Sequence, residues 1–119
     1  MLYGLSSTTR YYLYAGPADM RKSFDGLCGL VINHMDRDPM SGDVFIFMNR
    51  RRTLIKLLIW DQTGFVIYYK RLEKGTFELP SVEEGQSSVK ITRRMLMLIL
   101  EGISLQDIKT RKRYRRDYA

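Results

Sequence analysis

Three neighbouring segments in the middle of the chain consist almost entirely of apolar, β-branched and aromatic residues. They are residues 44–48 (VFIFM), 53–60 (TLIKLLIW) and 65–72 (FVIYYKRL), and two short polar stretches, 49–52 (NRRR) and 61–64 (DQTG), separate them. β-Branched and aromatic residues favour strands, whereas polar residues between such runs mark turns. The pattern therefore predicts a β-meander of three strands joined by two hairpin loops.

Further elements are predicted on either side of this meander. Residues 11–14 (YYLY) and 87–91 (SSVKI) have the composition of short strands. In residues 18–35 apolar side chains recur at helical spacing, and residues 93–102 hold a second apolar run that Thr92 is suited to cap. Together these elements predict an α+β fold, in which an antiparallel β-meander of four to five strands packs with one or two α-helices.

Loops of four residues at both turns would fix the register of the meander. The expected cross-strand pairs are Trp60–Phe65, Lys56–Tyr69 and Leu54–Arg71 in the second hairpin, and Phe45–Lys56 and Ile46–Ile55 in the first. Because side chains alternate along a strand, one face then becomes nearly all apolar and is expected to form the core. Its members are Val44, Ile46, Met48, Ile55, Leu57, Ile59, Val66 and Tyr68.

The opposite face carries aromatic side chains with cations between them, and two interpretations of it stay open. Its members are Phe45, Phe47, Lys56, Trp60, Tyr69 and Arg71. An exposed face of this kind binds nucleic acid, because aromatic rings stack on bases and cations neutralise phosphates. In the other interpretation the second helix covers the face, so that the aromatic side chains join the core and Lys56 extends its ammonium group toward solvent.

The chain has 119 residues, which is a common size for one domain with its own core. The net charge of +7 is unevenly distributed, since six basic residues and one acid after residue 108 contribute +5 and the rest of the chain contributes +2. We therefore expect an α+β domain in residues 1–108 and a basic tail in residues 109–119. Such a tail neutralises phosphates without reading sequence, although a terminal run of charge is often only solvated.

The residues that most enzymes depend on are scarce. His34 is the only histidine and Cys28 the only cysteine, and no nucleophile or carboxylate set follows a known catalytic or metal-binding pattern. A metal site built from Asp25, Asp43 and Asp61 remains an alternative that would make the protein a nuclease. We expect a protein without catalytic residues, metal or cofactor. With neither a secretion signal nor a membrane-spanning run, it is expected to be soluble and cytoplasmic.

Two long runs of the chain resemble a known family. They are YxYxGPADMRKSFDGLxGLV in residues 12–31 and DPxSGDVFIFxNRRRxxIKxLxWDxxGFxxYYKRLEKGxF in residues 38–77. Their motifs are dense and ordered, and they resemble the TnpB-type proteins encoded by the second open reading frame of bacterial insertion sequences of the sixty-six class. The resemblance covers residues 11–80. The last part of the acidic loop, which spans residues 73–86 and holds four glutamates, and the basic tail therefore lie outside it.

The resemblance implies an accessory protein that is encoded beside a separate, larger transposase and is required with it for efficient transposition. The carboxylates for strand transfer are then expected in that larger protein. The expected partners are DNA, above all the ends of the element, and the transposase itself. Pairing of the free edge of the meander with a second copy of the chain stays open, and no membrane partner is expected.

The hypothesis for DNA contact rests on basic residues near the aromatic hairpin and in the tail. They are Arg50, Arg51, Arg52, Lys56, Lys70 and Arg71, with Arg21 and Lys22, and with Arg111, Lys112, Arg113, Arg115 and Arg116. Trp60 and Tyr69 are the candidates for stacking, or else serve the fold. The alternative hypothesis is a protein–protein adaptor whose basic patch docks on an acidic surface of the transposase without contacting DNA.

Overall fold

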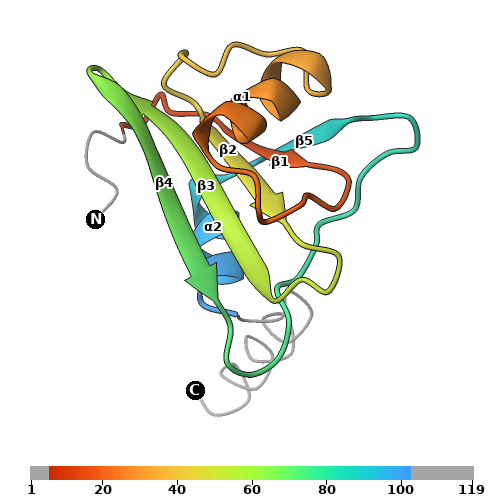
Figure 1. Cartoon of the computed structure of the whole chain (residues 1–119). Coiled ribbons are helices and arrows are strands. Elements are labelled where there is room, and N and C mark those ends of the chain that lie inside the picture. The colour runs from red at the N-terminus through yellow and green to blue at the C-terminus, as the bar shows by residue number, and fades with distance from the viewer. Residues whose placement is uncertain (1–5, 103–119) are drawn as a thin grey trace, which may run out of the picture.

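The computed structural model describes residues 6–102 of the chain (Figure 1). The elements, in chain order, are β1 (Tyr11–Tyr14), α1 (Phe24–Asn33), β2 (Val44–Met48), β3 (Leu54–Asp61), β4 (Gly64–Arg71), β5 (Ser88–Ile91) and α2 (Arg93–Leu100). Five strands form one sheet and two helices pack on it, which confirms the predicted α+β class. Within the described range, no helix is long and apolar enough to cross a bilayer.

The strands lie in the order β4-β3-β2-β1-β5, so β1 is inside the sheet and β4 and β5 form its edges. The β2–β3–β4 meander is antiparallel as predicted, and β5 also runs antiparallel to β1. The pair of β1 and β2 is parallel, which corrects the expectation of a wholly antiparallel sheet. Parallel neighbours need a connection of a dozen residues or more, and residues 15–43, which contain α1, supply it.

The two helices lie on opposite faces of the sheet (Figure 1). α2 packs on the face predicted to be the core, together with Phe77 from the loop after β4. α1 packs on the other face, where Phe45 and Phe47 are completely buried. Burial on both faces explains why β2 (VFIFM) is a continuous apolar run and does not alternate with polar residues. Of the predicted core residues, Val66 is 43% exposed, because β4 is an edge strand.

The register of the second hairpin agrees with the prediction at all three pairs. The register of the first hairpin was predicted wrongly by two residues, since Phe45 pairs with Leu58 and Ile46 with Leu57. The reason lies in Asn49, whose N–H donates to the carbonyl of Leu54 (3.2 Å) and moves the loop to residues 50–53. A shift of two residues leaves every side chain on its predicted face. The prediction of which residues face each side of the sheet is therefore correct although the register is wrong.

The first helix begins at Phe24, six residues later than the pattern predicted. The backbone before it makes tertiary hydrogen bonds in place of helical ones. The N–H of Ala18 donates to the carbonyl of Met48 (2.8 Å), and the carbonyls of Met20 and Lys22 accept from the ammonium of Lys56. Residues 18–23 therefore form a strap that is tied to β2 and β3.

A contact at each end fixes the second helix, and a long-range hydrogen bond fixes the loop before β5. The hydroxyl of Thr92 accepts from the N–H of Met95 (3.1 Å), which confirms the predicted cap. At the other end, the ammonium of Lys70 donates to the carbonyl of Leu100, where a cation stabilises the helix dipole. In the loop, the side chain of Phe77 is buried and its N–H donates to the carbonyl of Arg52 (2.7 Å). This bond ties the acidic loop to the basic hairpin.

Candidate nucleic-acid interface

The loop between β2 and β3 is held by the side chain of Asn49. The carbonyl oxygen of this side chain accepts from the N–H groups of Thr53 (2.9 Å) and Leu54 (3.0 Å), and its amide nitrogen donates to the hydroxyl of Thr53. The N–H of Arg52 closes a turn onto the backbone carbonyl of Asn49 (3.0 Å). These bonds, with that from Phe77, fix the loop backbone without using any arginine side chain.

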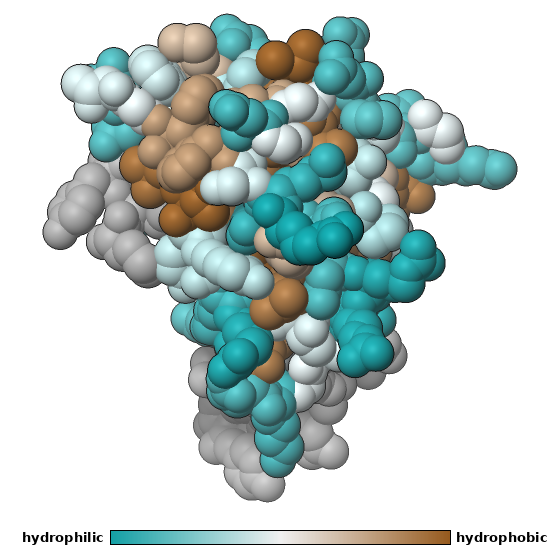
Figure 2. All heavy atoms as spheres, in the orientation of Figure 1, coloured by the Kyte–Doolittle hydropathy of each residue, from teal (hydrophilic) through white to brown (hydrophobic). Residues whose placement is uncertain are grey.

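Three consecutive cations project from this fixed backbone. Arg50 and Arg51 are exposed, and Arg52 is half-buried. Counting only partners in residues 6–102, none of the three forms an ion pair. Figure 2 shows hydrophilic side chains covering much of the end of the molecule where this loop lies. We call Arg50, Arg51 and Arg52 the hairpin arginines; their backbone is fixed, and the described part of the chain does not neutralise their charge.

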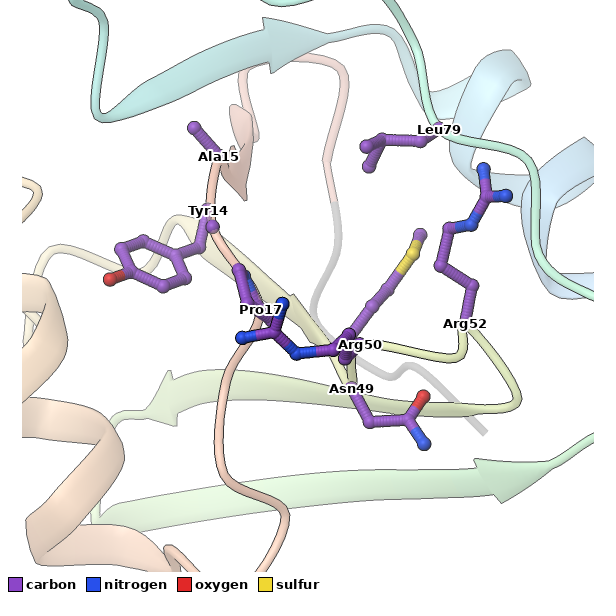
Figure 3. Close-up of a pocket in the computed structure, with 9 residues that line it drawn as sticks. Tyr14, Ala15, Pro17, Asn49, Arg50, Arg52 and Leu79 are labelled. Carbon is purple, nitrogen blue, oxygen red and sulfur yellow. The ribbon is translucent and has the colours of Figure 1, made fainter.

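A hollow of about 210 Å³ lies between the loop and the segment that follows β1 (Figure 3). Arg50 and Arg52 line it and Arg51 does not. In Figure 3 the guanidinium of Arg50 lies beside Pro17, whereas that of Arg52 extends toward Leu79. The remaining lining residues are Tyr14, Ala15, Gly16, Met48 and Asn49. The lining of the hollow thus combines apolar side chains with two cations.

Lys56, which was predicted to contact DNA, lies beneath this surface. Its side chain is 7% exposed, and its ammonium donates to the carbonyls of Met20 (2.9 Å) and Lys22 (2.8 Å). It also lies 4.6 Å from the ring centroid of Tyr69, at cation–π distance. Since the donors of Lys56 are engaged with the strap, we leave this residue out of the proposed contact surface. Lys70, which caps α2, is left out for the same reason.

Two further candidate arginines have carboxylate partners. Arg21 pairs with Asp19 (2.7 Å) and Arg71 with Glu73 (3.0 Å), all on exposed side chains. The hydrogen bonds from Arg21 lower the pKa of the Asp19 carboxyl from 3.8 to about 2, so this pair is ionised at neutral pH and is lost only as the pH falls toward 2. Exposed pairs exchange readily with other anions, and Arg21, Arg71 and the exposed Lys22 remain accessible, secondary candidates.

The aromatic face of the meander is covered, but by the first helix and not by the second as the alternative interpretation supposed. α1 buries Phe45 and Phe47, while Trp60 packs edge-on against Phe65 at 5.0 Å. Tyr69 remains 53% exposed. The face is therefore no continuous stacking platform, and only Trp60 and Tyr69 near its open edge keep accessible rings. The tail residues Arg111, Lys112, Arg113, Arg115 and Arg116 lie outside the described residues.

Comparison with known protein families shows to which family the chain belongs. The model of a family described as IS66 Orf2 like protein matches residues 9–110. The chain belongs to this family. The match confirms the resemblance found in the motifs, and it extends beyond them to include the acidic loop, β5 and α2.

Two relatives in Sinorhizobium fredii (strain NBRC 101917 / NGR234) are similar to this IS66 Orf2-like protein. Uncharacterized protein y4jC is 30% identical over 108 residues, which is 91% of each chain. Uncharacterized protein y4hO is 33% identical over 94 residues, which is 79% of this chain and 80% of the relative. No solved structure matches the chain. The relatives therefore support membership of the family over most of the chain.

In this IS66 Orf2-like protein, the side chains considered above for catalysis make contacts within the fold. Asp43 is buried and pairs with Arg10 (3.3 Å), and burial together with the charge of Asp25 raises the pKa of the Cys28 thiol, which keeps it protonated. His34 ends α1 and lies edge-on to the ring of Tyr14. Across residues 6–102, no three histidine, cysteine or carboxylate side chains are grouped so that they would hold a metal ion.

Sequence reasoning missed the apolar part of the hollow. Leu79 is 39% exposed and lies beside Arg52, although 27 positions separate them along the chain. Pro17 and Tyr14 come from a third segment. No spacing in the sequence joins these three segments, because the bond between Phe77 and Arg52 and the parallel pairing of β1 with β2 bring them together only in the folded chain.

Arg52 occupies a backbone conformation that favours glycine, with φ of 57°. An L-residue there costs about 1–2 kcal/mol relative to its relaxed conformation. We therefore expect Arg52→Gly to leave the free energy of unfolding unchanged or raise it by up to about 1 kcal/mol, measured by urea denaturation. Arg51→Gly is the matched control, since the φ of Arg51 is not positive and glycine there should lower the free energy by about 0.5–1 kcal/mol. Equal destabilisation by both variants would contradict this interpretation.

Proposed function

We propose that this protein is a non-catalytic accessory factor in the transposition of its insertion sequence, and that it binds DNA through the hairpin arginines and the basic tail. One observation carries the proposal. Three adjacent cations stand on a loop whose backbone is fixed by other residues, and no partner in the described chain neutralises them. One of them, Arg52, has a backbone conformation that favours glycine. A turn alone requires none of these charges.

The chemistry of such a surface is that of phosphate binding. Arginine donates from a planar fork that matches two oxygens of one phosphate, and it does so without recognising a base. The bonds of the Asn49 side chain hold the loop in one conformation, which lowers the entropy lost on binding. The surface is therefore suited to hold DNA in position, while recognition of sequence falls to other contacts or to the transposase.

Titration of a labelled element-end duplex by fluorescence anisotropy over a series of salt concentrations tests this proposal. Each phosphate neutralised on duplex DNA contributes roughly −0.9 to the slope of log affinity against log salt, so three hairpin contacts alone give a slope of about −3, and tail contacts make it steeper. Absence of binding at low salt would overturn the proposal. So would binding with a slope near zero.

The second candidate function is an adaptor that docks on an acidic surface of the transposase. The exposed, uncompensated charge of the hairpin supports this function as well, because acidic side chains bind the same forks. Co-purification separates the two functions: an adaptor complex with the transposase survives nuclease digestion and forms without DNA. A complex that is lost on nuclease treatment is held together by DNA.

A further inference from the structure

The hollow beside the hairpin has features that binding to regular duplex DNA does not explain. Phosphate neutralisation requires only exposed cations, as Arg51 alone would provide. Arg50 and Arg52 instead flank a cavity of about 210 Å³ whose wall includes Pro17, Met48 and Leu79. Leu79 is 39% exposed there, which leaves an apolar side chain in water on the side of the hollow toward which Arg52 extends. A lining that combines apolar side chains with two cations fits a ligand with an apolar face and anionic flanks.

We propose that this hollow receives one unpaired nucleobase of a single-stranded DNA segment, while Arg50 and Arg52 hold the phosphates on either side of it. The inference rests on the proposed function and specifies which form of DNA the site takes. A base has a planar face that stacks on apolar or guanidinium surfaces, and in a single strand this face is free. In a duplex the face is stacked on its neighbours and cannot enter a cavity.

The size of the hollow favours a single ring system. Sites for small-molecule ligands usually enclose about 300–1,000 Å³, and a volume of about 210 Å³ falls below that range. Pro17 and Leu79 approach it from separate segments, so the two apolar side chains form a wall against which one base packs. A folded partner protein would need a larger apolar surface than these few side chains provide.

The polar side chains in the lining do not distinguish one base from another. The side chain of Asn49 uses its oxygen and one of its two amide N–H groups on the loop, in three hydrogen bonds to Thr53 and Leu54. Figure 3 shows the hydroxyl of Tyr14 pointing away from the two arginines. Recognition by stacking and charge alone tolerates every base, so the site selects for the unpaired state and not for a sequence.

Three probes of equal duplex sequence test the inference by equilibrium titration. One is blunt, one carries a four-nucleotide single-stranded extension, and one carries the same extension with abasic nucleotides, which keep the phosphates and lack the bases. We expect the base-bearing extension to bind about tenfold more tightly than the abasic one, since stacking of one base contributes roughly 1–3 kcal/mol. Equal affinity for these two probes would overturn the inference and leave the proposed function standing. Failure of all three to bind would overturn both.

Two substitutions of exposed residues test whether the preference for the base-bearing extension arises at this hollow. Leu79→Ala removes part of the apolar wall and should reduce the preference for the base-bearing extension at least threefold, with little change in affinity for the blunt duplex. Arg51→Ala is the matched control, because Arg51 belongs to the same loop and does not line the hollow. It should weaken all three probes by one common factor. A preference that survives Leu79→Ala, or that falls with Arg51→Ala, would contradict the assignment to this hollow.

Discussion

Replacement of Arg50, Arg51 and Arg52 together by alanine is expected to weaken binding to element-end DNA about a hundredfold at low salt. Each charge-assisted contact with a phosphate contributes about 1 kcal/mol, and the three arginines stand on one loop where they engage together. The slope of log affinity against log salt should become less steep by about 3, because three fewer counterions are released. Fluorescence anisotropy at four or more salt concentrations measures both quantities.

The fold should tolerate this triple substitution. The loop is held by the side chain of Asn49 and by the backbone groups of Arg52, all of which remain. Thermal unfolding of the variant should therefore follow that of the parent closely. A loss of binding accompanied by unfolding would not count as loss of a contact, so the melting curve is part of the measurement.

A control variant with the same change in net charge separates local contact from general attraction. Lys90, Arg93 and Arg94 are exposed and lie at the Val44 end of the sheet, whereas the hairpin follows the Met48 end. At about 0.1 M salt their joint replacement by alanine should weaken binding by no more than roughly threefold, since a Debye length of about 10 Å screens charges that lie away from the bound phosphates. If the control weakens binding as much as the hairpin variant, the hairpin is not the contact.

Lys56→Met is expected to lower the free energy of unfolding by about 2–3 kcal/mol and to leave the DNA affinity of the folded protein unchanged. The substitution keeps the length of the side chain and removes two charge-assisted hydrogen bonds, to the carbonyls of Met20 and Lys22. Hydrogen bonds to charged groups contribute about 1.5–3 kcal/mol each, part of which is recovered where a freed carbonyl meets water. Urea denaturation measures the loss.

Lys74→Met is the matched control, since Lys74 is exposed on the loop after β4. Substitutions at such surface positions usually change stability by less than about 0.5 kcal/mol. A change just as small for Lys56→Met would show that the strap does not depend on the ammonium. A hundredfold loss of DNA affinity in folded Lys56→Met protein would restore Lys56 to the contact surface.

The sequence predicted the parts of this fold that depend on local pattern. Period-two alternation placed the side chains of β2, β3 and β4 on the correct faces, and the composition of the 93–102 segment placed α2 and its cap at Thr92. The register of the first hairpin could not be predicted, because it depends on Asn49, whose side chain closes the loop by bonds that are specific to this conformation. The turn composition alone did not distinguish residues 49–52 from residues 50–53.

Long-range contacts account for the other differences between the predicted and the observed structure. The helical pattern in residues 18–35 is present, yet the strap before Phe24 takes its hydrogen bonds from Met48 and Lys56. The sequence alone suggests that Lys56 is an exposed cation. The segments that bury it, α1 and the strap, lie far from it along the chain. The same limitation hid Leu79. The hairpin arginines are proposed from the sequence, because three adjacent cations exceed what a turn requires.

An NMR titration of the isotope-labelled protein with element-end DNA shows residue by residue whether the hairpin arginines receive DNA. We expect the largest shifts of amide and guanidinium signals at Arg50, Arg51 and Arg52, with smaller shifts at Leu79. The signals of Glu83 and Glu84 in the acidic loop should change little. Shifts that leave the hairpin unaffected at saturating DNA would show that DNA binds elsewhere.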